Sequence, residues 1–132
     1  MTWGAGAHGS TFGGNPVSCA ASLATIQLLE GGLIGNAAER GEEILRALRP
    51  LVDQYPGVVR DVRGLGLLIG VQFHDGKTAA AVEHAAFERG LLVLTAGDDV
   101  VRMSPPLVIT EAQAASAVRI FAEAVEAVAS CR

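Results

Sequence analysis

The chain has 132 residues, of which 50% are hydrophobic and 18% charged, and its mean hydropathy is positive. This composition excludes intrinsic disorder, and the length suits one domain of ordinary size or a piece of a larger protein. Ten basic against fourteen acidic residues give a net charge of −4 without a basic block, so we expect neither nucleic acid nor an anionic membrane as a partner.

The first 29 residues contain no Asp, Glu, Lys or Arg, which raises the question of a membrane span or a secretory signal. The charge-free run 9–29 is long enough to cross a bilayer, but Gly13-Gly14-Asn15-Pro16 interrupts it and several polar side chains follow. A secretory signal also needs a basic start, which this sequence lacks. We therefore predict neither kind of segment.

The two cysteines, Cys19 and Cys131, lie near opposite ends of the chain and share no spacing with a histidine. A zinc site needs clustered ligands, and a disulfide scaffold needs more cysteines for this length. The sequence therefore predicts no metal site, and a reducing cytoplasm is the expected compartment.

The first predicted helix follows a glycine-rich, irregular segment at residues 1–14. Asn15 is a typical N-cap residue and Pro16 suits the first helical position, so we expect a helix over residues 16–30 that ends at Gly31-Gly32. This helix is apolar or small on every side and therefore needs cover on every side. Such cover is hard to arrange within 132 residues, which indicates a larger partner surface.

Hydrophobic periodicity and turn signals predict the remaining elements. In chain order they are a helix over residues 33–54 with a kink or break at Pro50, strands over 58–63 and 67–73, a helix over 78–89 with Thr78 as its N-cap, hairpin strands over 91–95 and 100–103, and a helix opened by the capping box Thr110–Gln113. The strand at 67–73 is nearly continuous in Leu, Ile and Val, so it is expected to be central or buried on both faces. The predicted fold class is α/β, more narrowly a small α+β domain whose mainly antiparallel sheet carries its helices on one face.

The segment His8-Gly9-Ser10-Thr11-Phe12-Gly13-Gly14-Asn15-Pro16 is a candidate anion-binding loop. Small residues let backbone amides approach an anion, and the hydroxyls of Ser10 and Thr11 add donors just ahead of a helix. The alternative is a glycine-rich entry into an N-capped helix. Spacing alone favours this alternative, because glycine-rich loops are common false positives.

Arg102 is a second candidate. It is a lone charge at the end of an apolar strand, and Pro105-Pro106 stops the strand shortly afterwards. A guanidinium presents a fork that matches a carboxylate. An edge arginine whose stem covers apolar surface while its head reaches water fits the pattern equally well. The residues alone leave both interpretations open.

Three further features are predicted to have no catalytic role. The glycines of Arg63-Gly64-Leu65-Gly66 permit a tight bend between two strands. Lys77 is the single lysine and so the single possible Schiff-base former, but it lies in a polar loop where nothing would desolvate it. The histidines have no Ser, Cys or acid placed to make a triad evident: His8, His74 and His84.

Three stretches together resemble the class III pyridoxal-phosphate aminotransferases. They are the segment 8–16 with the apolar helix after it, Val62-Arg-Gly-Leu-Gly-Leu-Leu-Ile-Gly-Val71, and Val101-Arg-Met-Ser-Pro-Pro-Leu-Val-Ile-Thr110, in the family's order and spacing. The first and third are specific in combination, and the resemblance covers essentially the whole chain. Within the family, the sequence is most similar to the 4-aminobutyrate and acetylornithine aminotransferase type.

The resemblance implies that the chain corresponds to the C-terminal third of such an enzyme. In the family, a large upstream domain holds the cofactor-binding aspartate and the lysine that carries pyridoxal 5'-phosphate, and Lys77 does not match that lysine. Residues 1–30 would then be the anion loop and the apolar helix that join the large domain. Residues 31–132 would be the C-terminal small domain of a fold-type I enzyme, and the chain alone is expected to be inactive.

The resemblance also implies roles for three residues. Thr11 would bind the cofactor phosphate, with Ser10 as a helper, in a site shared between the subunits of a homodimer. Arg102 matches the arginine that grips the α-carboxylate of the amino-acid substrate. The full enzyme would bind amino-acid and 2-oxo-acid substrates and pass an amino group from an ω-amino acid to 2-oxoglutarate.

Two other interpretations stay open at this stage. An amino-acid racemase or mutase is built on the same scaffold and shares the same motifs. A free-standing, non-catalytic α+β module that binds a small ligand or a partner would carry no lysine-bearing domain upstream.

Overall fold

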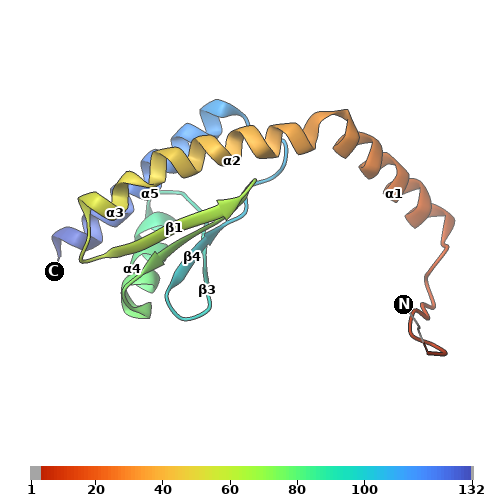
Figure 1. Ribbon diagram of the computed structural model, residues 1–132, viewed down its shortest axis with the longest axis horizontal. Helices are drawn as coiled ribbons and strands as arrows, with labels where there is room; N and C mark the ends of the chain where they lie inside the picture. Colours follow the sequence, from red (N-terminus) through yellow and green to blue (C-terminus); the bar gives the residue numbers. More distant parts are fainter. Residues whose placement is uncertain (1–3, 132) are drawn as a thin grey trace. The chain divides into compact units, whose positions relative to one another are not determined.

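The computed structural model describes residues 4–131, which divide into two units between Leu33 and Ile34 (Figure 1). The first unit consists of irregular turns, helix α1 (Pro16–Leu28) and the short π-helical segment η1 (Leu29–Leu33). Its N-cap is the predicted one, because the Asn15 side-chain oxygen accepts hydrogen bonds from the amides of Val17 at 2.9 Å and Ser18 at 3.3 Å.

The end of this helix agrees with the prediction. Helix α1 ends at Leu28, and helix α2 (Ile34–Leu48) follows η1. Within η1, the backbone of Gly32 has φ 136° and ψ −11°, a non-helical conformation that side-chain-bearing residues rarely adopt. The two helices are therefore separate, and the helical backbone is interrupted at Gly31-Gly32, where the sequence predicts the end of the first helix.

No residue of α1 is buried. Val17 is 78% exposed and Leu23 62% exposed, as the all-round apolar pattern predicted for a helix that needs cover from outside the chain. By length and composition alone, the helical run from Pro16 to Gln54 is also long and apolar enough to cross a membrane.

The second unit contains a four-stranded antiparallel sheet in the order β1-β2-β4-β3. Its strands are β1 (Val59–Leu65), β2 (Leu68–Phe73), β3 (Leu94–Ala96) and β4 (Val100–Met103). The predicted strand 67–73 is thus central, although its residues alternate between the two faces instead of being buried on both. Residues 91–93 are not part of the sheet, because the Leu91 amide donates to the Ala86 carbonyl at 2.9 Å and closes the preceding helix.

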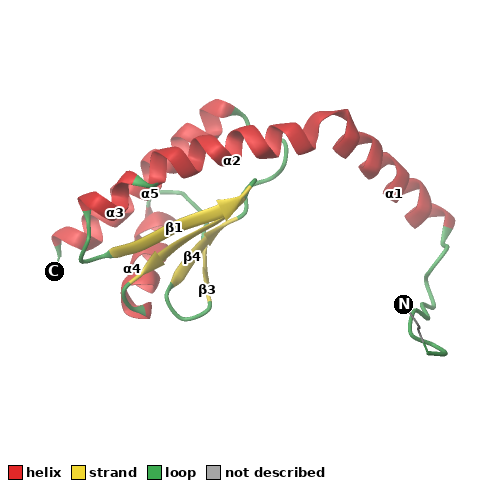
Figure 2. Ribbon diagram, in the orientation of Figure 1, coloured by secondary structure: helices red, strands yellow, loops and turns green. Residues whose placement is uncertain are grey.

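Helices α2, α4 (Gly76–Glu88) and α5 (Glu111–Ser130) cover one face of the sheet, which confirms the predicted fold class (Figure 2). The predicted break at Pro50 is also present, since α3 (Pro50–Gln54) begins there. The side chains facing the helices form the core, with Phe73 and Phe121 as its largest fully buried members.

The caps of α4 and α5 show one correction and one confirmation. Asp75, not Thr78, caps α4, and its carboxylate accepts hydrogen bonds from the Thr78 amide at 2.8 Å and the Thr78 hydroxyl at 2.9 Å. The stronger charged acceptor therefore takes the cap position and Thr78 becomes a buried donor. The predicted capping box of α5 is present, with Thr110 and Gln113 bonded to each other's amides.

Candidate functional site

Arg102 lies on the open face of the sheet, the face that the helices do not cover. The strand register aligns Arg63 of β1, Gly70 of β2 and Arg102 of β4 in one row across three neighbouring strands. The next row along the strands, Val62, Val71 and Val101, points to the opposite face and is buried. Because side chains alternate along a strand, the two arginines share the open face with only a glycine between them.

The two arginines of this row differ in their partners. The Arg63 guanidinium donates to the Asp61 carboxylate at 2.7 Å and to the Gln72 side-chain oxygen at 2.9 Å, and Gln72 in turn donates to the Asp99 carboxylate at 2.9 Å. Within residues 4–131, no hydrogen bond or ion pair joins Arg102 to another side chain. Arg102 is therefore an uncompensated cation on the open face and is available to an anion.

Gly70 leaves space beside Arg102. A Cβ at position 70 would lie 3.2 Å from the Val100 side chain, so even an alanine there would press against its neighbour. Without that atom, a shallow depression forms on the open face, with Arg63 and Arg102 at its margins and Leu68, Ala96 and Val100 among its lining residues. This arrangement suits a carboxylate that approaches from the open side of the sheet.

The candidate anion loop lies in the first unit, just ahead of α1. It is a series of turns, with the Gly13 amide bonded to the Ser10 carbonyl at 3.3 Å and the Asn15 amide to the Phe12 carbonyl at 3.3 Å. In the part of the chain that the structure describes, the exposed hydroxyls of Ser10 and Thr11 form no hydrogen bond. The nearest acidic residue in sequence is Glu30, so no local carboxylate repels a phosphate, and the residues present fit such a group.

Lys77 is exposed in the first turn of α4. Buried apolar neighbours, which would make a lysine amine reactive by desolvating it, do not surround this side chain. The side chain is solvated, as predicted, but Lys77 belongs to helix α4 and not to the predicted loop, because Asp75 caps the helix ahead of it. The structure gives Lys77 no feature of a cofactor-carrying residue.

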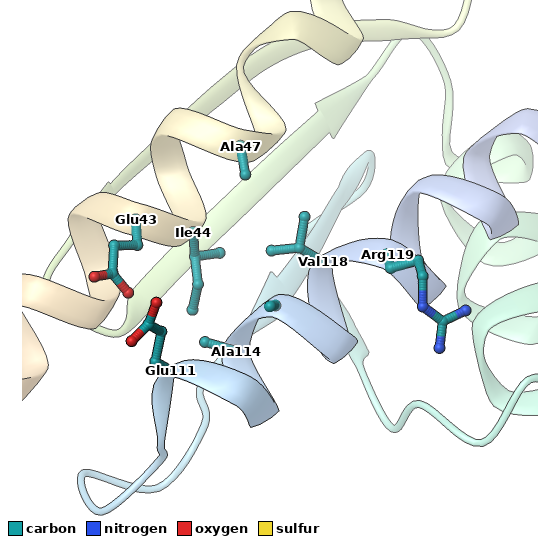
Figure 3. Close-up of a pocket in the computed structure, with 8 residues that line it drawn as sticks. Glu43, Ile44, Ala47, Glu111, Ala114, Val118 and Arg119 are labelled. Carbon is teal, nitrogen blue, oxygen red and sulfur yellow. The ribbon is translucent and has the colours of Figure 1, made fainter.

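A larger groove runs between α2 and α5 and encloses about 390 Å³. Figure 3 shows the carboxylates of Glu43 and Glu111 at one end and Arg119 at the other, with Ile44 and Val118 between them. The charges are matched, because Arg40 contacts both carboxylates and Arg119 pairs with Glu123 at 2.7 Å. We assign the groove no part in the candidate site, because it contains neither a predicted site residue nor an unpaired charge.

The predicted site residues thus fall into two places. Ser10 and Thr11 belong to the first unit and Arg102 to the second. Sequence reasoning identified Arg102 but not its neighbours Arg63 and Gln72. These residues are neighbours because of the register between strands. The alternation of apolar residues in β1 and β2 predicts which face a side chain lies on, but not which residues pair.

A family model for class III aminotransferases matches residues 1–125. The chain therefore belongs to the class III aminotransferase family. Its sequence is 45% identical over 123 residues to an acetylornithine aminotransferase of Synechocystis sp., a match that covers 91% of this chain. It is 40% identical over 129 residues to the mitochondrial acetylornithine aminotransferase of Neurospora crassa, a match that covers 93% of this chain.

Solved structures give the same result. The acetylornithine aminotransferase of Elizabethkingia anophelis matches with a TM-score of 0.84 at 32% identity, covering 96% of this chain and 32% of that one. The ornithine delta-aminotransferase of Plasmodium falciparum matches with a TM-score of 0.85 at 30% identity, covering 98% and 34%. The chain spans 29% of the length of the Synechocystis relative and 26% of the Neurospora relative.

Proposed function

We propose that this chain is the C-terminal portion of a pyridoxal-phosphate-dependent aminotransferase that moves an amino group from an ω-amino acid of the acetylornithine type to 2-oxoglutarate. The observation that carries the proposal is the unpaired Arg102 beside Gly70 on the open face of the sheet. The names of the relatives support transamination and give no support to the racemase or the non-catalytic module.

Different residues bind the two anions, the substrate carboxylate and the cofactor phosphate. Arg102 orients a substrate by gripping its carboxylate with two parallel donors, which fixes both the position and the plane of that group. Ser10 and Thr11 supply hydroxyl donors for the cofactor phosphate. Pyridoxal phosphate, when bound, supplies the electron sink that makes amino-group transfer possible. Lys77 has no part in this chemistry.

The proposal extends to the assembly and the compartment. The exposed apolar surface of α1 supports a homodimer in which this helix meets other protein, since exposed apolar patches commonly mark interaction sites. The same surface accounts for the helix's apolar composition without a membrane. A reducing cytoplasm suits the chain because Cys19 and Cys131 are exposed free thiols.

The activity is tested by comparing this chain with a polypeptide that carries it at the full length of the relatives. The longer polypeptide should convert 2-oxoglutarate to glutamate with acetylornithine as donor, whereas the 132-residue chain should show no transamination. Borohydride treatment with pyridoxal phosphate should give no stoichiometric adduct at the exposed Lys77. One adduct per chain at Lys77, or no glutamate from the longer polypeptide, would contradict the proposal.

Replacing Thr11 by alanine in the full-length enzyme should weaken pyridoxal-phosphate binding by about 1–3 kcal/mol, the usual loss for a hydrogen bond to a charged group. Thr11→Ser should lose much less, because it keeps the hydroxyl. Equilibrium titration of the apoenzyme with the cofactor measures both effects. Unchanged affinity in Thr11→Ala together with lost binding in Ser10→Ala would assign the phosphate contact to Ser10 instead.

A further inference from the structure

The segment that follows the Arg102 strand is attached to helix α2 by one side chain. Asn36, in the first turn of α2, donates from its side-chain nitrogen to the carbonyl of Leu107 at 2.7 Å and to the carbonyl of Ile109 at 3.1 Å. Both carbonyls belong to residues 104–110, which connect β4 to α5. One amide group therefore joins parts of the chain that are 71 and 73 residues apart in sequence.

The chain between this attachment and Arg102 is unusually stiff. Proline fixes φ at positions 105 and 106, and a residue that precedes a proline is itself restricted to extended backbone. The Ile109 amide also donates to the Pro106 carbonyl at 2.9 Å, which closes the turn. The segment between Leu107 and Met103 therefore has few soft dihedral angles.

Helix α2, which carries Asn36, is held firmly in the second unit. Helix α2 buries Ile44, Leu45 and Leu48 in the core. Its Gly41 lies directly against the backbone of Gly66 in the turn between β1 and β2. Because β2 pairs with both β1 and β4, the helix and the Arg102 strand belong to one packed body within the second unit.

We propose that Asn36 is a positioning residue for Arg102: its amide holds the segment after β4 on helix α2 and thereby sets the direction of the guanidinium toward the substrate carboxylate. This inference rests on the proposed function of Arg102. Asn36 itself touches neither substrate nor cofactor in this role. Replacing Asn36 should therefore impair the reaction with carboxylate substrates. Steps that do not depend on the Arg102 guanidinium should be unaffected.

The test uses Asn36→Asp in the full-length enzyme, because aspartate has nearly the same shape but cannot donate to two carbonyls. We expect kcat/KM for glutamate to fall about 10-fold, mainly through a higher KM, as a misdirected contact would produce. The half-reaction with an ω-amine that lacks an α-carboxylate should be unchanged. Asn36→Gln keeps the amide donors and should recover part of the loss.

Thr78→Val is the matched control for a purely structural effect. Thr78 is buried and its hydroxyl bonds to the Asp75 carboxylate, away from residues 104–110, so this variant removes a hydrogen bond without touching the segment. It should lower stability and leave the ratio of the two half-reactions as in the wild type. Equal losses in both half-reactions for Asn36→Asp, or no loss at all, would overturn the inference.

A second measurement needs no activity. In the 132-residue chain, hydrogen exchange of the Ile109 amide should become faster in Asn36→Asp and stay at the wild-type rate in Thr78→Val, after correction for global stability. Unchanged exchange in Asn36→Asp would refute the attachment itself. If exchange accelerates but the wild-type full-length enzyme transfers no amino group, the proposed function fails and the attachment stands.

Discussion

Arg102→Lys in the full-length enzyme should lower kcat/KM for glutamate and 2-oxoglutarate by on the order of 10–1000-fold, equivalent to roughly 1.4–4 kcal/mol of transition-state binding. The reason is geometric, because lysine keeps the positive charge but presents a single ammonium where two parallel donors are needed. Gly70 lies beside Arg102 and has no side chain that would block an approaching carboxylate. No acidic side chain in the described part of the chain forms an ion pair with Arg102 in place of the substrate.

The internal control for this substitution is a substrate without the group that Arg102 grips. The half-reaction with an ω-amine lacking an α-carboxylate should be nearly unaffected, and the cofactor's absorbance change measures each half-reaction separately. Arg60→Gln supplies the surface control, since Arg60 is an exposed arginine of β1 for which the described residues offer no ion pair. Equal losses in both half-reactions would instead indicate that Arg102 is a surface arginine whose stem covers apolar surface.

Most of the fold could be predicted because local signals and long-range packing agree. Asn15 and Thr110 occupy the N-cap positions that their sequences indicate, and the break at Pro50 follows from the chemistry of one residue. The errors occurred where two local signals compete. At the start of α4, both Asp75 and Thr78 are good caps, and the carboxylate takes the position.

The candidate site was predictable only in part. Composition and spacing alone left two interpretations of Arg102 open. The resemblance to a family favoured the one in which Arg102 binds a carboxylate. The neighbours of Arg102 depend on pairing between strands, and the register of β1 shifts at an irregularity between Val59 and Asp61. No periodicity indicates such a shift in advance. The contact from Asn36 to Leu107 is still harder to foresee, because it joins an amide and a carbonyl without any sequence pattern.

Gly41 of α2 packs directly against the backbone of Gly66 in the β1–β2 turn. A Cβ at Gly41 would overlap the carbonyl oxygen, the carbonyl carbon and the Cα of Gly66. All three atoms belong to the backbone, and Gly66 itself has φ +54°, so the turn cannot yield as a flexible side chain would. The helix and the turn must therefore separate to admit even one methyl group.

Gly41→Ala should consequently destabilise the second unit by about 2 kcal/mol or more, because the cost of overpacking exceeds the gain of about 1 kcal/mol that alanine gives a helix. Gly35→Ala is the matched control in the same helix, since nothing lies within 4 Å of a Cβ at that position. That variant should stabilise the unit by about 0.5–1 kcal/mol. Urea unfolding followed by circular dichroism measures both changes, and midpoints that move in opposite directions are expected. If Gly41→Ala raised the midpoint as Gly35→Ala does, helix propensity alone would govern position 41, and the close contact with Gly66 would have no energetic consequence.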